Sequence, residues 1–189
     1  IMPSLVGSEM CIRDREKTVS TEEIFDGKIL KLRVEQVEMP GGNLAVREIV
    51  EHPGGVGIVA VTDEDEIILV KQFRKPVEKA IYEVPAGKLD NNEDHRACGI
   101  RELSEETGYS AENFDYLGFM YPSPGFADEV THLYLATGLT KGENHLDPDE
   151  YLDVEFIPID DVKKMIMDNE INDAKTVFGV FKALEVLGK

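Results

Sequence analysis

Length, composition and charge limit what this chain can be. It has 189 residues, of which 42% are hydrophobic, so it is long enough to bury a core and is not intrinsically disordered. A formal net charge of −18 without a cluster of Lys or Arg disfavours binding to nucleic acid or acidic membranes. No apolar run reaches the roughly 18 residues of a membrane span, and Cys11 and Cys98 have no disulfide or zinc spacing. We therefore expect a soluble, cytoplasmic protein.

The N-terminal third divides into two stretches. Residues 1–15 read IMPSLVGSEMCIRDR, show no strand or helix periodicity, and resemble translated read-through of a sequencing adapter, so we expect a non-native leader outside the fold. Residues 16–52 alternate apolar and polar side chains around Asp26-Gly27. This alternation predicts a small antiparallel sheet ahead of the main domain, which we place at 53–189.

The main domain shows a mixture of strand and helix patterns, which predicts an α/β (α+β) fold with a mixed sheet between helices. Short apolar runs predict strands at 55–62, 66–74, 80–87, 114–121, 131–139 and 151–159. Helical patterns occupy 160–170 and 173–188. In the last helix, apolar spacing predicts one core-facing stripe made of Val177, Phe178, Phe181 and Leu184.

A further helix is predicted in the middle of the chain. Asp90 followed by Glu93 is typical of a capping box at a helix start, and Gly108 is a typical helix end. Within this helix three carboxylates fall in an arc of roughly 100°, since each residue advances by about that angle. They are Glu102, Glu105 and Glu106.

Carboxylates crowded on one helix face repel one another and destabilise an isolated helix by a few tenths of a kcal/mol per pair. A bound cation reverses that cost, and hard oxygen ligands of this kind suit Mg²⁺ or Mn²⁺. The alternative is a solvated acidic helix face, which is the usual meaning of a run of charges.

The same stretch matches a family pattern in full. Gly87 is followed after five residues by Glu93 and after seven more by Arg101, which opens the string RELSEETG before Tyr109. This resembles the Nudix box, G-x5-E-x7-R-E-U-x-E-E-x-G-U, where U is a bulky apolar residue. Tyr109 is the one soft departure, because an aliphatic residue is commoner there. The resemblance implies a Nudix-type α/β/α sandwich that cleaves a nucleoside diphosphate linked to another group.

The resemblance also implies a metal site and its ligands. Glu102 and Glu106 correspond to the principal ligands, Glu105 to a further ligand or a water-positioning group, and Ala86 to a backbone carbonyl ligand. Arg101 corresponds to the residue that holds a glutamate in its orientation. The implied cofactor is Mg²⁺, with Mn²⁺ as a substitute, which neutralises the pyrophosphate and activates water.

The flanking sequence resembles the ADP-ribose pyrophosphatase branch of the family. Pro124 lies 16 residues beyond Gly108, and the strings around Arg47 and Arg74 resemble the same branch. By that resemblance the two arginines are nucleotide-side cations and Glu129 contacts the ribose or phosphate side. The alternatives are surface salt bridges for the arginines and a simple turn for Pro124.

The resulting hypothesis is a Mg²⁺-dependent enzyme that hydrolyses ADP-ribose to AMP and ribose 5-phosphate. The resemblance implies a homodimer with exchanged N-terminal strands, and it places the catalytic base at Glu150, with Glu129 as the rival. Two alternatives stay open: a nucleotide-sugar Nudix hydrolase acting on GDP-mannose or a similar compound, and a non-catalytic nucleotide sensor. The sensor is disfavoured because such proteins usually lose box glutamates or add a DNA-binding module.

Overall fold

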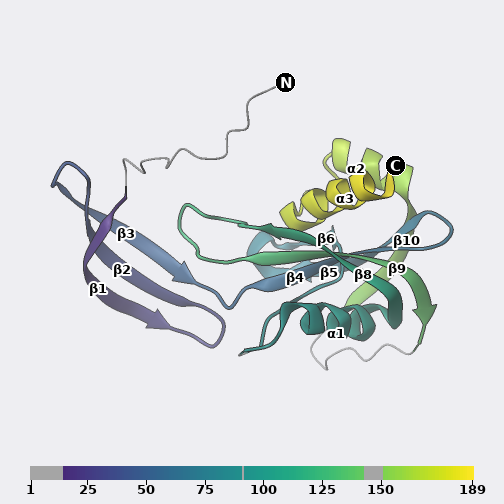
Figure 1. The fold of residues 1–189 in the computed structure, drawn as a ribbon, viewed down its shortest axis with the longest axis horizontal. Helices are drawn as coiled ribbons and strands as arrows, with labels where there is room; N and C mark the ends of the chain where they lie inside the picture. The colour runs from purple at the N-terminus through teal and green to yellow at the C-terminus, as the bar shows by residue number, and fades with distance from the viewer. Residues whose placement is uncertain (1–14, 91, 143–150) are drawn as a thin grey trace, which may run out of the picture. The chain divides into compact units, whose positions relative to one another are not determined.

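A computed structural model describes residues 15–90, 92–142 and 151–189 (Figure 1). The predicted leader, except Arg15, therefore lies outside the described residues, as does Glu150. The chain forms two compact units, one made of the residues up to His52 with Gly125–Ala127, and the other of Pro53–Pro124 with Asp128–Lys189. Each unit is described separately.

The first unit is a three-stranded antiparallel sheet. Its strands are β1 (Lys17–Asp26), β2 (Lys31–Glu38) and β3 (Leu44–Glu51), paired in that order. The segment Gly125–Ala127 belongs to the same unit, and the backbone N–H of Val50 donates to the carbonyl of Phe126 at 2.8 Å. Most side chains of this sheet are exposed or half-buried, and Val37 is the one buried hydrophobic residue among its described strands. The predicted small antiparallel sheet is confirmed.

The second unit is built on a mixed sheet. Its central path runs β10-β5-β4-β9-β8, with β6 on β5 and β7 on β4. The strands are β4 (Gly55–Val61), β5 (Glu66–Arg74), β6 (Lys79–Glu83), β7 (Ala86–Lys88), β8 (Tyr109–Met120), β9 (Thr131–Lys141) and β10 (Leu152–Pro158). Only β4 and β9 pair in parallel among these strands. Every residue of β4 is buried, because this strand is central and both of its faces are covered.

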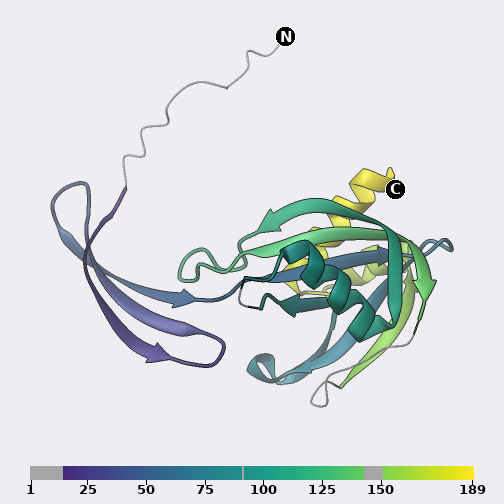
Figure 2. The ribbon, with the colours of Figure 1, turned by 60° about the horizontal axis from the view of Figure 1, so that its bottom comes forward.

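Helices cover both faces of this sheet. The helix α1 (His95–Thr107) lies on one face, and α2 (Ile159–Met167) and α3 (Ala174–Leu187) lie on the other (Figures 1 and 2). A 3₁₀ turn (Lys75–Val77) joins β5 to β6. The alternating side chains of β4 feed two cores, with Ile58 packed in the α1 cluster and Val59 in the α3 cluster. The α/β/α sandwich is confirmed, and no helix in the described part of the chain is long and apolar enough to cross a membrane.

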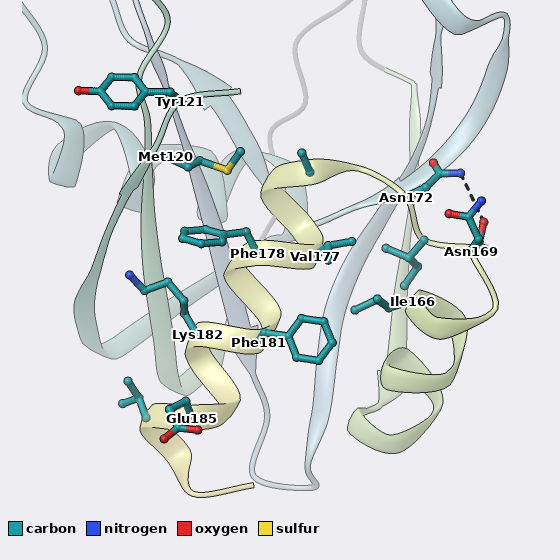
Figure 3. A pocket seen from close by; sticks show the side chains of 13 residues that line it. Met120, Tyr121, Ile166, Asn169, Asn172, Val177, Phe178, Phe181, Lys182 and Glu185 are labelled. Carbon is teal, nitrogen blue, oxygen red and sulfur yellow. Dashed lines mark hydrogen bonds between the residues drawn. The ribbon is translucent and has the colours of Figure 1, made fainter. Parts of the chain in front are cut away.

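The predicted core stripe of α3 is wrong for its two aromatic residues. Phe178 and Phe181 are 42% and 47% exposed, whereas Gly179, Val180 and Leu184 are buried. The helix turns its small residues to the sheet because a Cβ on Gly179 would already lie 3.2 Å from Val59. The two phenylalanines instead line an open groove of about 1000 Å³, in which Phe178 extends toward Met120 and Phe181 extends to the other side, toward Ile166 (Figure 3).

Candidate active site

The helix that carries the carboxylates begins later than the sequence predicts. Asp94, not Asp90, is its N-cap, and its carboxylate accepts hydrogen bonds from the backbone N–H of Arg96 and of Ala97 at 3.1 and 3.0 Å. Glu93 accepts from the backbone N–H of Asp90 at 3.1 Å, so this pair closes the preceding loop instead. Gly108 ends the helix with φ 74°, as predicted.

Arg101 is the centre of an ion-pair network on α1. Its Nε and Nη2 donate to the two oxygens of Glu93, both at 3.1 Å. Its Nη1 donates to Glu102 and to Glu105, both at 2.8 Å. The hydrogen bonds from Arg101 lower the pKa of Glu93 to about 2. One guanidinium therefore fixes three carboxylates, two of which, Glu102 and Glu105, are candidate metal ligands.

Glu102 and Glu106 do not lie on a solvated face. They are only 8% and 3% exposed, because the strand β7 packs against their carboxylates. The backbone N–H of Ala86 donates to Oε2 of Glu106 at 2.9 Å. A Cβ on Gly87 would lie 1.9 Å from Oε1 of Glu102, so only glycine fits there. The solvated-face interpretation is wrong for these two residues.

The donor chemistry of this corner fits a hard divalent cation. Two buried carboxylates of one helix lie against the backbone of Ala86 and Gly87, and Mg²⁺ typically takes one or two carboxylates together with waters and substrate phosphates. Across 15–90, 92–142 and 151–189 no group of three or more His, Cys, Asp or Glu side chains is arranged to hold a metal by itself. A cation held here would therefore depend on further oxygen ligands from water or substrate.

A second ion-pair network contains Arg74 and two residues that the sequence did not mark. Nε and Nη2 of Arg74 donate to the two oxygens of Glu83 at 2.5 and 3.0 Å. Lys175, on α3, also donates to Glu83. Glu106 is close enough for its charge to raise the pKa of Arg74, after the larger effect of Glu83. The only sequence signal for Glu83 was an acid at the end of an apolar strand.

The remaining predicted residues lie elsewhere. Arg47 is on β3, in the first unit, where its Nε donates to Glu16 at 2.9 Å. Pro124 is exposed in a turn and Glu129 is half-buried, both in the connection from β8 to β9. Glu150 lies outside the described residues. Both arginines form salt bridges, but only that of Arg47 is a surface salt bridge, because Glu83, the partner of Arg74, is 2% exposed.

His95 and His132 form an aromatic cluster with Tyr116 and Tyr134 at the start of α1. The rings of His95 and His132 stack with centroids 3.9 Å apart. Nδ1 of His95 lies 2.6 Å from the hydroxyl of Tyr134, and Nδ1 of His132 lies 2.9 Å from that of Tyr116. Cys98 is fully buried nearby on α1, and burial raises the pKa of its thiol to about 12. These contacts suit packing, not nucleophilic or metal chemistry.

Comparison with known families agrees with this geometry. Residues 51–178 match the NUDIX domain, and residues 16–50 match the nucleoside diphosphate sugar hydrolase N-terminal domain. The chain therefore belongs to the Nudix family, whose characterised members include hydrolases.

Its relatives narrow the class. The chain is 47% identical over 167 residues to an ADP-ribose pyrophosphatase of Bacillus subtilis strain 168, which covers 87% of this chain and 90% of the relative. It is 50% identical, with the same coverage, to a protein of Bacillus methanolicus described as a methanol dehydrogenase activator. A solved structure of an ADP compounds hydrolase superimposes with a TM-score of 0.82 at 22% identity, covering 92% of this chain and 95% of that one. That last similarity supports the fold alone.

Proposed function

We propose that the chain is a cytoplasmic, Mg²⁺-dependent ADP-ribose pyrophosphatase that releases AMP and ribose 5-phosphate. The observation that carries the proposal is the 47% identity to the Bacillus subtilis ADP-ribose pyrophosphatase along 87% of this chain. A relative of Mycobacterium tuberculosis with the same description is 37% identical over 168 residues.

In this proposal the α1 corner holds the metal. Glu102, Glu106 and the carbonyl of Ala86 are the ligands, and Glu105 is a further ligand or positions water. When bound, Mg²⁺ (or Mn²⁺ in its place) would neutralise pyrophosphate charge and activate water for in-line displacement. Arg101 keeps Glu102 in place through its hydrogen bond at 2.8 Å.

The other predicted residues are proposed to bind or activate the substrate. Arg74 and Arg47 act as nucleotide-side cations, because a guanidinium carries a positive charge and several donors; the Nε and Nη2 of Arg74 hold Glu83, so phosphate would approach its Nη1 side. Glu129 contacts the ribose side in the loop that also carries Pro124. Glu150 is proposed as the general base.

A homodimer is part of the proposal, and the first unit supports it. Phe25, Leu44 and Val46 are 52%, 58% and 61% exposed on its three-stranded sheet. Pairing places Leu44 and Val46 opposite Glu38 and Gln36, on the same face as Phe25. Exposed apolar side chains gathered on one face of a small sheet favour a partner surface, and a second copy of this chain supplies a matching one.

A nucleotide-sugar hydrolase is the second candidate. It is favoured by the match of residues 16–50 to the nucleoside diphosphate sugar hydrolase N-terminal domain. A GDP-mannose pyrophosphatase of Yersinia pestis is 30% identical over 148 residues, covering 70% of this chain and 71% of the relative. The description methanol dehydrogenase activator names no cleaved bond, so it favours neither candidate.

One substrate panel decides between the candidates. The purified chain is incubated with Mg²⁺ and, separately, ADP-ribose, GDP-mannose and UDP-glucose, and the products are identified by chromatography. We expect AMP and ribose 5-phosphate from ADP-ribose, at a kcat/KM at least tenfold above that of either sugar nucleotide. Preference for GDP-mannose would replace the proposal with the second candidate, and dependence on added Mg²⁺ is checked with EDTA.

A further inference from the structure

Glu83 is a buried carboxylate that the proposed catalytic scheme does not yet use. Its side chain is 2% exposed at the end of β6, three residues before Ala86. Two cations from different elements converge on it: Arg74 from the end of β5 and Lys175 from the first turn of α3. A buried carboxylate that binds two cations is costly to keep in a structure unless its geometry is specific.

The charge of Glu83 is maintained by its partners. Burial alone would raise the pKa of Glu83, but hydrogen bonds from Arg74 and the charge of Lys175 hold it below its usual value. The carboxylate is therefore an anion at neutral pH. Both of its oxygens accept hydrogen bonds from Arg74, one from Nε and one from Nη2. Arg74 remains 41% exposed, so its guanidinium is held at the surface of the site instead of being hidden.

The chain directly after the end of β6 is also held by a hydrogen bond between uncharged groups. The hydroxyl of Thr176, which is fully buried, accepts a hydrogen bond from the backbone N–H of Val84 at 2.8 Å. It donates in turn to Asp173, the N-cap of α3, at 2.7 Å. Asp173 also pairs with Lys175 at 3.1 Å. The start of α3 therefore holds two successive residues: Lys175 pairs with the charged Glu83, and Thr176 accepts a hydrogen bond from the backbone of Val84.

We infer that Glu83, supported by Lys175, is a positioning residue that presents the guanidinium of Arg74 to the anionic part of the substrate beside Glu106. The inference rests on the proposed function, in which Arg74 binds the nucleotide side. An arginine fixed in advance loses less side-chain freedom when phosphate binds, so the ion pair strengthens substrate binding without touching the substrate. Lys175 adds a second positive charge beside the carboxylate of Glu83, and Asp173 pairs with that lysine at 3.1 Å.

The test compares Glu83→Gln with Thr176→Val. Glu83→Gln keeps the size of the side chain but removes the charge that orders Arg74. We expect KM for ADP-ribose to rise about tenfold, while kcat changes by less than about threefold, because the metal-side carboxylates are untouched. The dissociation constant of the non-hydrolysable analogue α,β-methylene ADP-ribose, measured by calorimetry, should rise by the same factor.

Thr176→Val is the matched control, because it breaks the neutral bond to the same strand end. It should lower the melting temperature yet leave KM within about twofold. If Glu83→Gln only lowers the melting temperature, or if both variants raise KM equally, Glu83 is an anchor of the strand and the inference is wrong.

Action through Arg74 is tested by a double-mutant cycle. In the Arg74→Ala background, Glu83→Gln should change KM by less than about twofold, since the group it positions is gone. An unchanged tenfold rise in that background would overturn the inference. Should Glu83→Gln fail to fold, Glu83→Gln/Lys175→Met replaces it, because the double variant removes the excess positive charge that the loss of Glu83 leaves among Arg74, Lys175 and Asp173.

Failure of this inference is distinguishable from failure of the proposed function. The function fails if the unmodified chain does not cleave ADP-ribose, and the variants are then compared on the sugar nucleotide that it does cleave. The inference fails if the unmodified chain is active and Glu83→Gln leaves its KM unchanged.

Discussion

Helices α1 and α3 cover opposite faces of one sheet, but they use their buried sides differently. The buried side of α1 includes two glutamates, Glu102 and Glu106, alongside Cys98 and Leu103. The buried side of α3 consists of small or apolar residues with one threonine, and it leaves two phenylalanines exposed. In the proposed scheme, burial on α1 serves metal binding at a cost in stability, whereas burial on α3 serves stability.

The largest effect we expect comes from removing one carboxylate of α1. Glu106→Gln should lower kcat by about 10³-fold or more, which is about 4 kcal/mol of barrier, because a proposed metal ligand loses its charge. Its stability should stay equal or rise, since the repulsion between Glu102 and Glu106 is relieved. Steady-state kinetics and thermal melting without metal measure both effects.

The control for this prediction is Asp160→Asn on α2, whose side chain is 94% exposed and lies outside the proposed site. It should keep normal kcat. Near-normal turnover of Glu106→Gln with Mg²⁺ would exclude Glu106 from the metal site.

The next largest effect concerns the backbone that packs on the carboxylates. Gly87→Ala places a Cβ 1.9 Å from Oε1 of Glu102, so the carboxylate or the strand must shift. We expect kcat to fall about 10²-fold, because a displacement of about 1 Å is enough for such a loss. Gly41→Ala is the control, since the nearest atom to its new Cβ lies at 3.9 Å. Equal activity of the two variants would show that the tight fit at Gly87 is not needed.

Sequence reasoning predicted the carboxylate face of α1 better than the core-facing side of α3, although it predicted the ends of α3 better than the start of α1. The metal site that the family pattern implies needs carboxylates at fixed spacing, so Glu102 and Glu106 could be proposed as ligands from the sequence. The core-facing side of α3 could not be predicted, because that helix has more apolar residues than one face can bury, and Gly179 decided which face approaches the sheet. Glu83 and Lys175 could not be paired either, since they are 92 residues apart in the chain.

On α3 we expect the loss of stability on substitution by alanine to follow the burial of the side chain and not its size. Leu184→Ala removes a side chain that is 3% exposed and should cost about 3 kcal/mol. Phe181→Ala removes a larger side chain that is 47% exposed and should cost only about 1 kcal/mol. At about 2–4 °C per kcal/mol, thermal melting separates the two variants.

Neither substitution on α3 should change the KM for substrate, because neither residue lies in the proposed site. An equal or larger loss for Phe181→Ala would show that the groove in Figure 3 is covered in solution. Repeating the melts at several protein concentrations tests a second copy as the cover, since only then should the difference between Phe181→Ala and the unmodified chain depend on concentration.

The smallest expected effect is a pH dependence at the start of α1. The pKa of Glu93 is about 2 in the folded protein, against a usual value near 4.5, chiefly because Arg101 donates hydrogen bonds to it. A folded-state pKa below the unfolded one contributes stability that is fully present above about pH 4.5 and is lost as pH falls toward about 2. The contribution is limited by solvent screening, because most of this network lies near the surface.

Glu93→Gln isolates this contribution, because it cannot titrate. The free energy of unfolding of both proteins is measured by urea denaturation at pH 3, 4, 5 and 7 and constant salt. The carboxylates that do not contact Arg101 keep the same surroundings in the two proteins, so their titration cancels in the difference. The advantage of the unmodified chain should be constant between pH 5 and 7 and should shrink at pH 4 and again at pH 3. Parallel stability curves across this range would mean that Arg101 does not hold Glu93 in the folded protein, and that the order of α1 depends on its Asp94 cap and its packing alone.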